Sequence, residues 1–214
     1  MDVDKPSYVV FDENAIEYDQ WFDKNRIVYE NEVSLLKKFF PCEKPCIEIG
    51  VGTGRFAQPL GIEVGLDPSV EALKIAHRRG VLVASGFGEA APFRSESFSM
   101  VYIIVTLCFV ENPYKVLEEA VRILKKGGRL VVCIIPLDSS LGLIYHRKKV
   151  TKQSIFYSHA TFYTKSQLVE MLSSLNLRIL KVASTLTKTG LEPLAEEPVE
   201  GDKGSFVCYE AAKE

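Results

Sequence analysis

The sequence predicts an α/β fold built on a parallel sheet, and three observations lead to this prediction. A short apolar run, Cys46–Ile49, reads as a buried parallel strand, because such strands are covered on both faces. Glycines follow at positions 50, 52 and 54, which indicates a tight turn where the backbone closely approaches another group. Strand-like apolar runs and helix-like amphipathic segments then alternate along the chain.

Length and charge are those of one ordinary globular domain. The chain has 214 residues, a net charge of −2 and a sequence pI near 6.0. A single α/β domain of this length buries a sizeable core. The near-neutral balance lacks the basic field that nucleic-acid-binding proteins show. We therefore expect one domain over residues 1–214, with no strong nucleic-acid signal.

The apolar runs, the N-terminal residues and the cysteine count favour an intracellular setting. No apolar run approaches the length of a membrane span, and Met1–Asp4 is acidic rather than signal-like. We expect a cytoplasmic protein with no membrane partner. Five cysteines, an odd count, favour reduced thiols over a disulfide framework. Cys42 and Cys46 lack a second Cys or His pair, so we predict no metal site and interpret Cys46, Cys108 and Cys133 as small buried hydrophobic residues.

The N-terminal segment and the elements after the glycines can be placed by periodicity and by turn residues. Residues Ala15–Phe40 have helical character, and their aromatic residues Tyr18 and Trp21 either pack this segment onto the sheet or form part of a lid over a ligand. The later segments are predicted as a second strand Ile62–Asp67, a helix Val70–His77, a third strand Val81–Ala84, a fourth strand Met100–Val105, a helix from Asn112 that ends at Lys125–Gly128, a fifth strand Arg129–Pro136, a helix opened by a capping box at Thr164–Gln167, and closing strands Arg178–Leu186 and Ser205–Ala211.

The spacing of the glycines indicates which ligand this turn receives. The dinucleotide fingerprint is G-x-G-x-x-G, but here the third glycine comes one residue early and Arg55 stands where the last one would be. Glu48 places a carboxylate beside the turn, which would repel a pyrophosphate. A ligand with a positive amino group and hydroxyls would be better received. Asp67, at the carboxyl end of the second strand, can accept two hydrogen bonds from a ribose diol.

These residues resemble motif I, (D/E)-x-G-x-G-x-G, of the class I S-adenosylmethionine-dependent methyltransferases. Asp67-Pro68-Ser69 follows in the family's order, and the block Ser85–Phe93 resembles its "G-D-A-E-x-L-P-F" block. The resemblance covers nearly the whole chain from about Tyr18, as in the small, prokaryotic-type, single-domain group. Two positions depart from it: Phe87 replaces the Asp that binds the adenine amino group, and Ser99 replaces the Asp after Phe98.

The resemblance implies a fold and a cofactor. The fold is a three-layer α/β/α sandwich with a seven-stranded, mostly parallel sheet whose last strand is antiparallel. Residues 1–45 would form an N-terminal helical cap, 46–135 the cofactor-binding core, and 136–214 the substrate-facing segment and closing strands. The cofactor would be S-adenosyl-L-methionine, whose sulfonium carries the reactive methyl group.

The resemblance also assigns site residues. The methionine half would meet Glu48 and the backbone of the following loop, and the ribose would meet Asp67 and its neighbours. Phe87 would lie by the adenine, although a plain core role for it is equally open. The full set of expected cofactor-binding residues is Tyr18, Glu48, Gly50, Val51, Gly52, Thr53, Gly54, Asp67, Pro68, Ser69, Phe87, Gly88, Glu89, Val105 and Thr106.

The acceptor is expected along residues Leu137–Tyr163, where the pattern becomes irregular. The basic run His146–Lys149 is either a solvated helix face or a group that attracts an anionic substrate. His159 and Tyr157 are candidate bases, against a structural role for the histidine, and no catalytic residue is assigned. The fourth strand is not followed by the Asn/Asp-Pro-Pro-Tyr tetrad of nucleobase amino-methyltransferases. Cys108 is expected to pack rather than act as a nucleophile.

We therefore predict methyl transfer from S-adenosylmethionine to an unidentified small-molecule acceptor. The alternatives are an RNA or protein methyltransferase, a non-catalytic S-adenosylmethionine-binding protein, and an NAD-dependent oxidoreductase.

Overall fold

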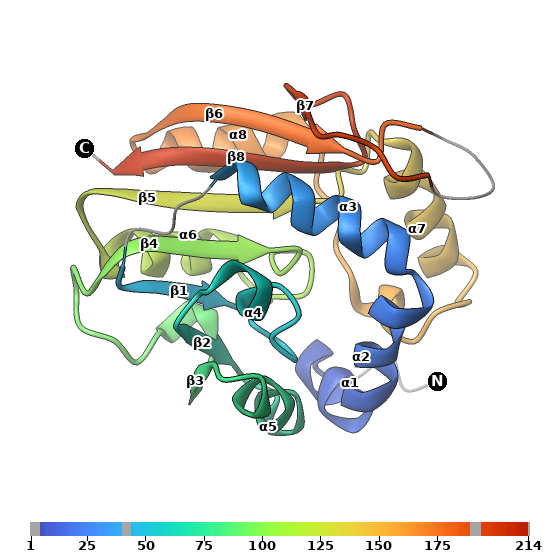
Figure 1. Cartoon of the computed structure of the whole chain (residues 1–214), viewed down its shortest axis with the longest axis horizontal. Helices are drawn as coiled ribbons and strands as arrows, with labels where there is room; N and C mark the ends of the chain where they lie inside the picture. Colours follow the sequence, from blue (N-terminus) through green and yellow to red (C-terminus); the bar gives the residue numbers. More distant parts are fainter. Residues whose placement is uncertain (1–4, 40–43, 189–193, 214) are drawn as a thin grey trace.

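A single mixed sheet forms the centre of the molecule, in a computed structural model that describes residues 5–39, 44–188 and 194–213 (Figure 1). Its strand order is β3-β2-β1-β4-β5-β8-β6-β7. The strands are β1 (Cys46–Ile49), β2 (Val64–Asp67), β3 (Leu82–Ser85), β4 (Phe98–Ile104), β5 (Leu124–Ile134), β6 (Leu177–Thr185), β7 (Val199–Glu200) and β8 (Phe206–Lys213).

The predicted strand directions are confirmed. Strands β1 to β5 pair in parallel, and β8 inserts antiparallel between β5 and β6. The sheet has eight strands rather than the expected seven, because the short β7 pairs with β6 opposite Ala183 and Ser184. The order reverses beside β1, between β2 and β4, and ligands of open α/β sheets bind at the carboxyl ends of strands beside such a reversal.

Helices cover both faces of this sheet and so complete the predicted three-layer sandwich. Helices α3, α4 and α5 pack on one face, through residues such as Leu36, Leu60 and Ala76, and α6 and α8 pack on the other. The helical elements are α1 (Ser7–Glu13), α2 (Ala15–Lys24), α3 (Arg26–Leu36), η1 (Lys37–Phe39), α4 (Ala57–Leu60), α5 (Val70–Arg78), η2 (Gly88–Ala90), α6 (Pro113–Ile123), α7 (Ser140–Val150), η3 (Tyr157–His159) and α8 (Lys165–Ser174).

The N-terminal helical cap begins beyond the carboxyl ends of the strands, where α1 and α2 lie, and continues as α3 over one face of the sheet (Figure 1). It consists of three α-helices, whereas a single helical segment starting at Ala15 was predicted. Asn14 and Asn25 end α1 and α2, and each side-chain amide donates to the carbonyl four residues earlier, 2.8 Å away. Such bonds compete with continuation of the helix, so each asparagine turns the chain and wraps it around the strand ends.

One predicted strand boundary was wrong, and one helix was missed. Strand β5 begins at Leu124 rather than Arg129, because Leu124 already pairs with Phe98 of β4 and Gly127 adopts a positive φ of 71°. The irregular pattern after Leu137 concealed α7. This helix leaves Leu143 and Ile144 exposed, so its apolar residues do not form the stripe by which helices are recognised. The predicted capping box on α8 is confirmed.

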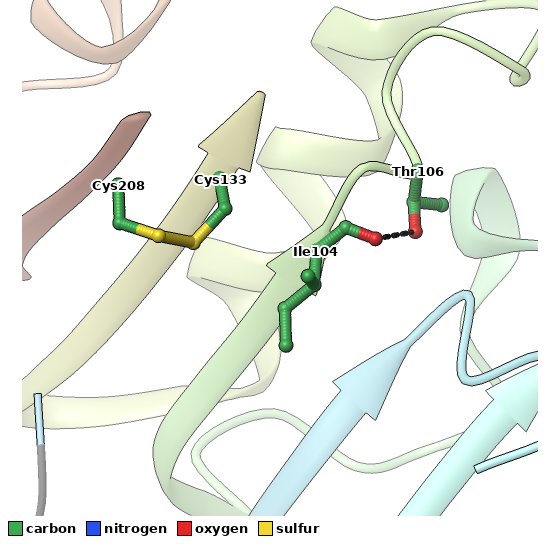
Figure 2. The surroundings of a disulfide bond; sticks show 4 residues. All are labelled: Ile104, Thr106, Cys133 and Cys208. Carbon is green, nitrogen blue, oxygen red and sulfur yellow. Dashed lines mark hydrogen bonds between the residues drawn. A yellow bond between two sulfur atoms is a disulfide. The ribbon is translucent and has the colours of Figure 1, made fainter. Parts of the chain in front are cut away.

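A disulfide joins β5 to β8, which contradicts the expectation of reduced thiols. Figure 2 shows the bridge between Cys133 and Cys208. The two residues lie directly opposite each other in the antiparallel register, with Cα atoms 4.1 Å apart, and both are fully buried. Cys46 is also disulfide-bonded, and Cys42, four residues earlier in the sequence, lies outside the described residues. The odd cysteine count could not reveal this, because the pairing depends on where β8 inserts.

No helix within the described ranges has the length and apolarity needed to span a membrane. The cytoplasmic location stays a prediction.

Candidate active site

The glycine loop, residues 50–54, follows β1 at the carboxyl edge of the sheet. Gly50, Gly52 and Gly54 all have positive φ, at 76°, 51° and 78°. Glycine is the residue that adopts this conformation at low cost. A Cβ on Gly50 would also collide with the side chain of Thr106, and one on Gly54 would lie 3.1 Å from the Cβ of Ala76 in α5. The loop therefore packs between the ends of neighbouring elements with little room for side chains.

Asp67 ties the glycine loop to the end of β2. Its Oδ2 accepts a hydrogen bond from the Gly52 N–H at 2.8 Å, and its Oδ1 accepts one from the Ser69 N–H at 2.9 Å. Burial raises the pKa of Asp67 to about 6, although both backbone bonds act in the opposite direction. Each carboxylate oxygen has a second lone pair. The carboxylate can therefore hold the loop and still accept hydroxyl donors from a ligand.

Glu48 presents an unsatisfied carboxylate oxygen at the end of β1. Its side chain is only 1 % exposed, and Oε2 has no hydrogen-bond partner among the described residues. Burial, with the nearby charge of Asp67, raises the pKa of Glu48 well above its usual range, against a hydrogen bond from the Ala57 N–H. A buried polar atom without a partner is costly. An amino group of a ligand would satisfy it, so the site fits the ammonium of S-adenosylmethionine.

The predicted adenine residues follow β3. Phe87 is 49 % exposed and meets Tyr8 of α1 edge-to-face, with ring centroids 5.3 Å apart, so the alternative that it is a core residue is wrong. Gly88 is buried, and a Cβ there would lie 2.9 Å from the side chain of Ile49. Glu89 instead accepts backbone N–H bonds from Glu111 and Asn112, at 3.1 and 3.4 Å. The exposed ring of Phe87 thus remains available to a planar ring, Gly88 is enclosed by its neighbours, and Glu89 holds the chain before α6.

The remaining predicted residues lie around these groups. Ser69 caps α5, and its hydroxyl also donates to the Asp12 carboxylate of α1 at 3.0 Å; Pro68 lies between Asp67 and this cap. Thr106 donates its hydroxyl to the Ile104 carbonyl at 3.0 Å, as Figure 2 shows. Val105 has a positive φ of 50°, which is strained for a β-branched residue. Its N–H donates to the Cys133 carbonyl, and the strained turn directs Val105 into the cavity described next.

An aromatic cavity of about 670 Å³ lies beyond the ends of β4 and β5, under α1, α2, α7 and η3. Many of the lining side chains are aromatic: Phe11, Tyr18, Trp21, Phe22, Phe56, Phe109, Tyr145, Phe156, Tyr157, Phe162 and Tyr163. The other lining residues used below are Glu17, Lys24, Glu32, Val105, Cys108 and Lys148. This volume suits a small organic molecule. The sequence located the η3 part of this cavity but not the part contributed by α1 and α3.

Tyr18 lies at the boundary between the cavity and the glycine loop. It lines the cavity, and its ring would stand 3.4 Å from a Cβ on Gly52. Burial, together with the charges of Asp67, Glu48 and Glu32, raises the pKa of Tyr18. Its phenol therefore stays protonated at neutral pH. A group bound at the loop and a group bound in the cavity would both contact this ring.

An ion-pair cluster holds the cap over the glycine loop, and sequence reasoning missed it. Asp19 of α2 accepts hydrogen bonds from Arg55, at 2.7 and 2.9 Å, and from Arg79, at 2.7 and 2.8 Å. Burial alone would raise the pKa of Asp19, but the bonds from Arg79 and Arg55 outweigh it and lower that pKa. The available signal was Arg55, which directly follows the last glycine of the motif. Its side chain bonds to Asp19 and so anchors the cap.

The candidate bases are not equivalent in the structure. Tyr157 lines the cavity, and burial raises its pKa well above the usual range, so it is a neutral phenol. His159 lies on η3 but is not among the residues that line the cavity. Burial raises the pKa of Cys108 to about 12, which leaves it a thiol. No group of three potential metal ligands occurs within the ranges that the structure describes.

An open sheet that reverses beside β1, a glycine loop between Glu48 and Asp67, and an inserted antiparallel last strand together define a class I S-adenosylmethionine-dependent methyltransferase. A family model described as "Methyltransferase domain" matches residues 47–132. The chain is also 43 % identical over 205 residues to an uncharacterized protein of Methanocaldococcus jannaschii, covering 95 % of this chain and 98 % of that one.

Two further comparisons agree. A crystal structure from Thermotoga maritima, named as a SAM-dependent methyltransferase and possible histamine N-methyltransferase, superimposes with a TM-score of 0.90 at 38 % identity and covers 97 % of this chain and 100 % of that one. A demethylmenaquinone methyltransferase of Renibacterium salmoninarum is 37 % identical over 92 residues, covering 40 % of this chain and 39 % of that one. The chain belongs to the S-adenosylmethionine-dependent methyltransferases, which sets aside the oxidoreductase and non-catalytic alternatives.

Proposed function

We propose that this enzyme transfers the methyl group of S-adenosylmethionine to a small organic acceptor bound in the aromatic cavity. The cavity carries the proposal, because it lies between the cap helices and α7 and nearly half of its lining residues are aromatic. It meets the glycine loop at Tyr18, so an acceptor in it would lie next to a cofactor on the loop. Holding two reactants in contact contributes much of the catalysis in such a reaction.

The same proposal assigns the cofactor residues. Glu48 would accept from the amino group and Asp67 from the ribose hydroxyls, while Phe87 and Gly88 would flank the adenine. Glu48 Oε2 is the supporting observation at one end and the exposed ring of Phe87 at the other. The cofactor supplies an activated methyl group when bound. The chain's own residues bind and orient it and exclude water.

The small acceptor is favoured over RNA or protein for two reasons. The cavity lies under the helical cap, and the net charge of −2 gives no general attraction for phosphates. The names of the Thermotoga and Renibacterium relatives also denote small organic molecules as acceptors. We accordingly treat residues 1–45 as the cap, 46–135 as the cofactor core and 136–214 as the acceptor-facing and closing part.

A coupled assay tests this proposal. Purified enzyme with S-adenosylmethionine would be offered a panel of aromatic and aliphatic metabolites, total RNA and a peptide mixture, and release of S-adenosylhomocysteine would be recorded. We expect turnover with at least one small molecule. Cys108→Trp, which fills the cavity, should abolish that turnover and leave cofactor binding intact. Leu143→Trp, on the exposed face of α7, should leave both turnover and cofactor binding unchanged. Turnover with RNA or peptide alone would contradict the proposal.

A further inference from the structure

Glu32 of α3 is a buried carboxyl that lines the aromatic cavity. Its side chain is 4 % exposed, and no hydrogen bond or ion pair joins it to another residue in the described ranges. Burial raises the pKa of Glu32 to about 8. Asp19, by contrast, is paired with Arg55 and Arg79. An unpaired ionisable group inside a cleft is a candidate binding group, because its burial is otherwise costly.

The rings around Glu32 suit a cation. Tyr145 and Tyr157 stack with centroids 4.3 Å apart, and the charge of Glu32 acts on both phenols. Aromatic faces attract ammonium groups, most strongly where water is excluded. The Lys148 ammonium already lies 5.7 Å from the centroid of the Tyr145 ring. The cavity therefore combines a carboxylate with aromatic faces, which is the combination that recognises organic ammonium ions.

The cofactor has its own acidic groups, separate from Glu32. The charge of Asp67 helps to raise the pKa of Glu48. The causes of the raised pKa values of these two carboxyls do not include Glu32. Tyr18 lies between the two groups, because its phenol is subject to all three charges. The exposed Glu17 and Lys24 at the cavity wall are solvated, unlike Glu32. Glu32 thus belongs to the acceptor side.

We propose that the acceptor is a small amine with an apolar, ring-sized body, and that the Glu32 carboxylate binds its ammonium group and takes its proton. This rests on the proposed function. In the reaction, the ammonium N–H gives its proton to Glu32. The freed nitrogen lone pair then forms the N–C bond as the C–S bond of the sulfonium breaks. The products are a methylated ammonium ion and neutral S-adenosylhomocysteine, and Glu32 passes the proton to solvent.

Binding measurements test the amine. Calorimetry in the presence of S-adenosylhomocysteine would compare a panel of arylalkylamines, beginning with 2-phenylethylamine, with the matched alcohols, beginning with 2-phenylethanol. We expect the amines to bind to the wild type more tightly than the matched alcohols do. Glu32→Gln should lower the affinity for the amines at least about tenfold and leave the affinity for the alcohols unchanged. Glu30→Gln, at an exposed glutamate of the same helix that pairs with Arg26 and does not line the cavity, is the matched control and should change neither.

The pH profile provides a readout that a purely structural Glu32 would not change. The phenols facing Glu32 are Tyr18 of α2, Tyr29 of its own helix, Tyr145 of α7 and Tyr157 of η3, and burial raises the pKa of each. These groups stay neutral where Glu32 titrates. The cations of Lys24 and Lys148 also line the cavity. For an amine substrate, kcat/KM should rise as pH passes about 8, and Glu32→Gln should remove that limb.

Each contrary outcome has its own meaning. If no amine of the panel binds better than its alcohol, or if Glu32→Gln changes nothing, the amine proposal is overturned. If Glu32→Gln weakens the binding of S-adenosylmethionine itself, Glu32 serves the cofactor and the proposal is again overturned. In both cases methylation of an uncharged small molecule would leave the proposed function standing. Turnover of RNA or peptide only would instead defeat that function.

Discussion

The glycine loop and the aromatic cavity meet at Tyr18, but they are built in different ways. The loop is made of backbone from consecutive residues, and Asp67 closes it from the neighbouring strand through the Gly52 N–H. The cavity is made of side chains from segments as distant as Phe11, Glu32 and Phe156. The loop would therefore recognise a ligand through fixed backbone geometry. The cavity would recognise one through shape, aromatic faces and a buried carboxyl.

The largest expected effect breaks the loop. In Gly50→Ala the new Cβ would collide with Thr106 at a φ of 76°, so we expect cofactor affinity to fall at least about a hundredfold. Gly61→Ala is the matched control, because Gly61 has a φ of 64° and nothing within 4 Å of its Cβ position. It should cost some stability but keep the affinity. Calorimetry with S-adenosylhomocysteine and circular dichroism would separate these effects, and an unchanged affinity in Gly50→Ala would remove the loop from the cofactor site.

The next effect tests Asp67, which holds the loop and is proposed to bind the ribose. Asp67→Ala removes the acceptor of the Gly52 and Ser69 N–H groups and the expected ribose contacts. Cofactor affinity should fall about tenfold to a hundredfold while the fold persists. Asp67→Asn keeps one carbonyl oxygen and should lose less. Equal affinity in all three proteins, measured by titration calorimetry, would contradict the ribose assignment.

A smaller effect should separate the cavity from the loop. Phe156 contacts Phe11 and Tyr18, with centroids 5.1 and 5.7 Å away, rather than the glycine loop itself. Phe156→Ala should raise the KM of an acceptor about tenfold and leave cofactor affinity nearly unchanged. Tyr18→Ala should change both quantities, because Tyr18 touches both regions. Steady-state kinetics with a substrate from the acceptor panel would show whether the two variants differ in this way.

The last effect concerns stability and pH rather than ligand binding. Glu32 has an ordinary pKa of 4.5 and a pKa of about 8 in the folded protein, so its ionisation opposes folding. Stability from this group is complete below pH 4.5 and is lost as pH rises to about 8, with an upper limit of about 5 kcal/mol from the pKa difference. Glu32→Gln cannot ionise. Its Tm should equal that of the wild type near pH 4.5 and exceed it at pH 9; the reverse order at pH 9 would contradict the burial of an unpaired charge.

The sequence predicted the loop well because its signals are local. Glu48 ends an apolar run, the three glycines share one turn, and Asp67 closes the next strand, so each residue's position follows from its neighbours. The cavity was predicted only in part. Tyr18 and Tyr157 were recognised as aromatic residues near the site, but Glu32 looked like one charge among many on an amphipathic helix. Its burial depends on how α3 turns after Asn25.

By itself, then, the sequence determined most of the strands and helices, the glycine turn after β1 and the class of enzyme. These follow from hydrophobic periodicity and from the φ requirements of single residues. Only the tertiary structure decided that Cys133 faces Cys208, that Phe87 is exposed, that Asp19 fixes the cap to Arg55, and that Glu32 enters an aromatic cavity. Those features join residues far apart in the chain, and packing rather than local propensity brings them together.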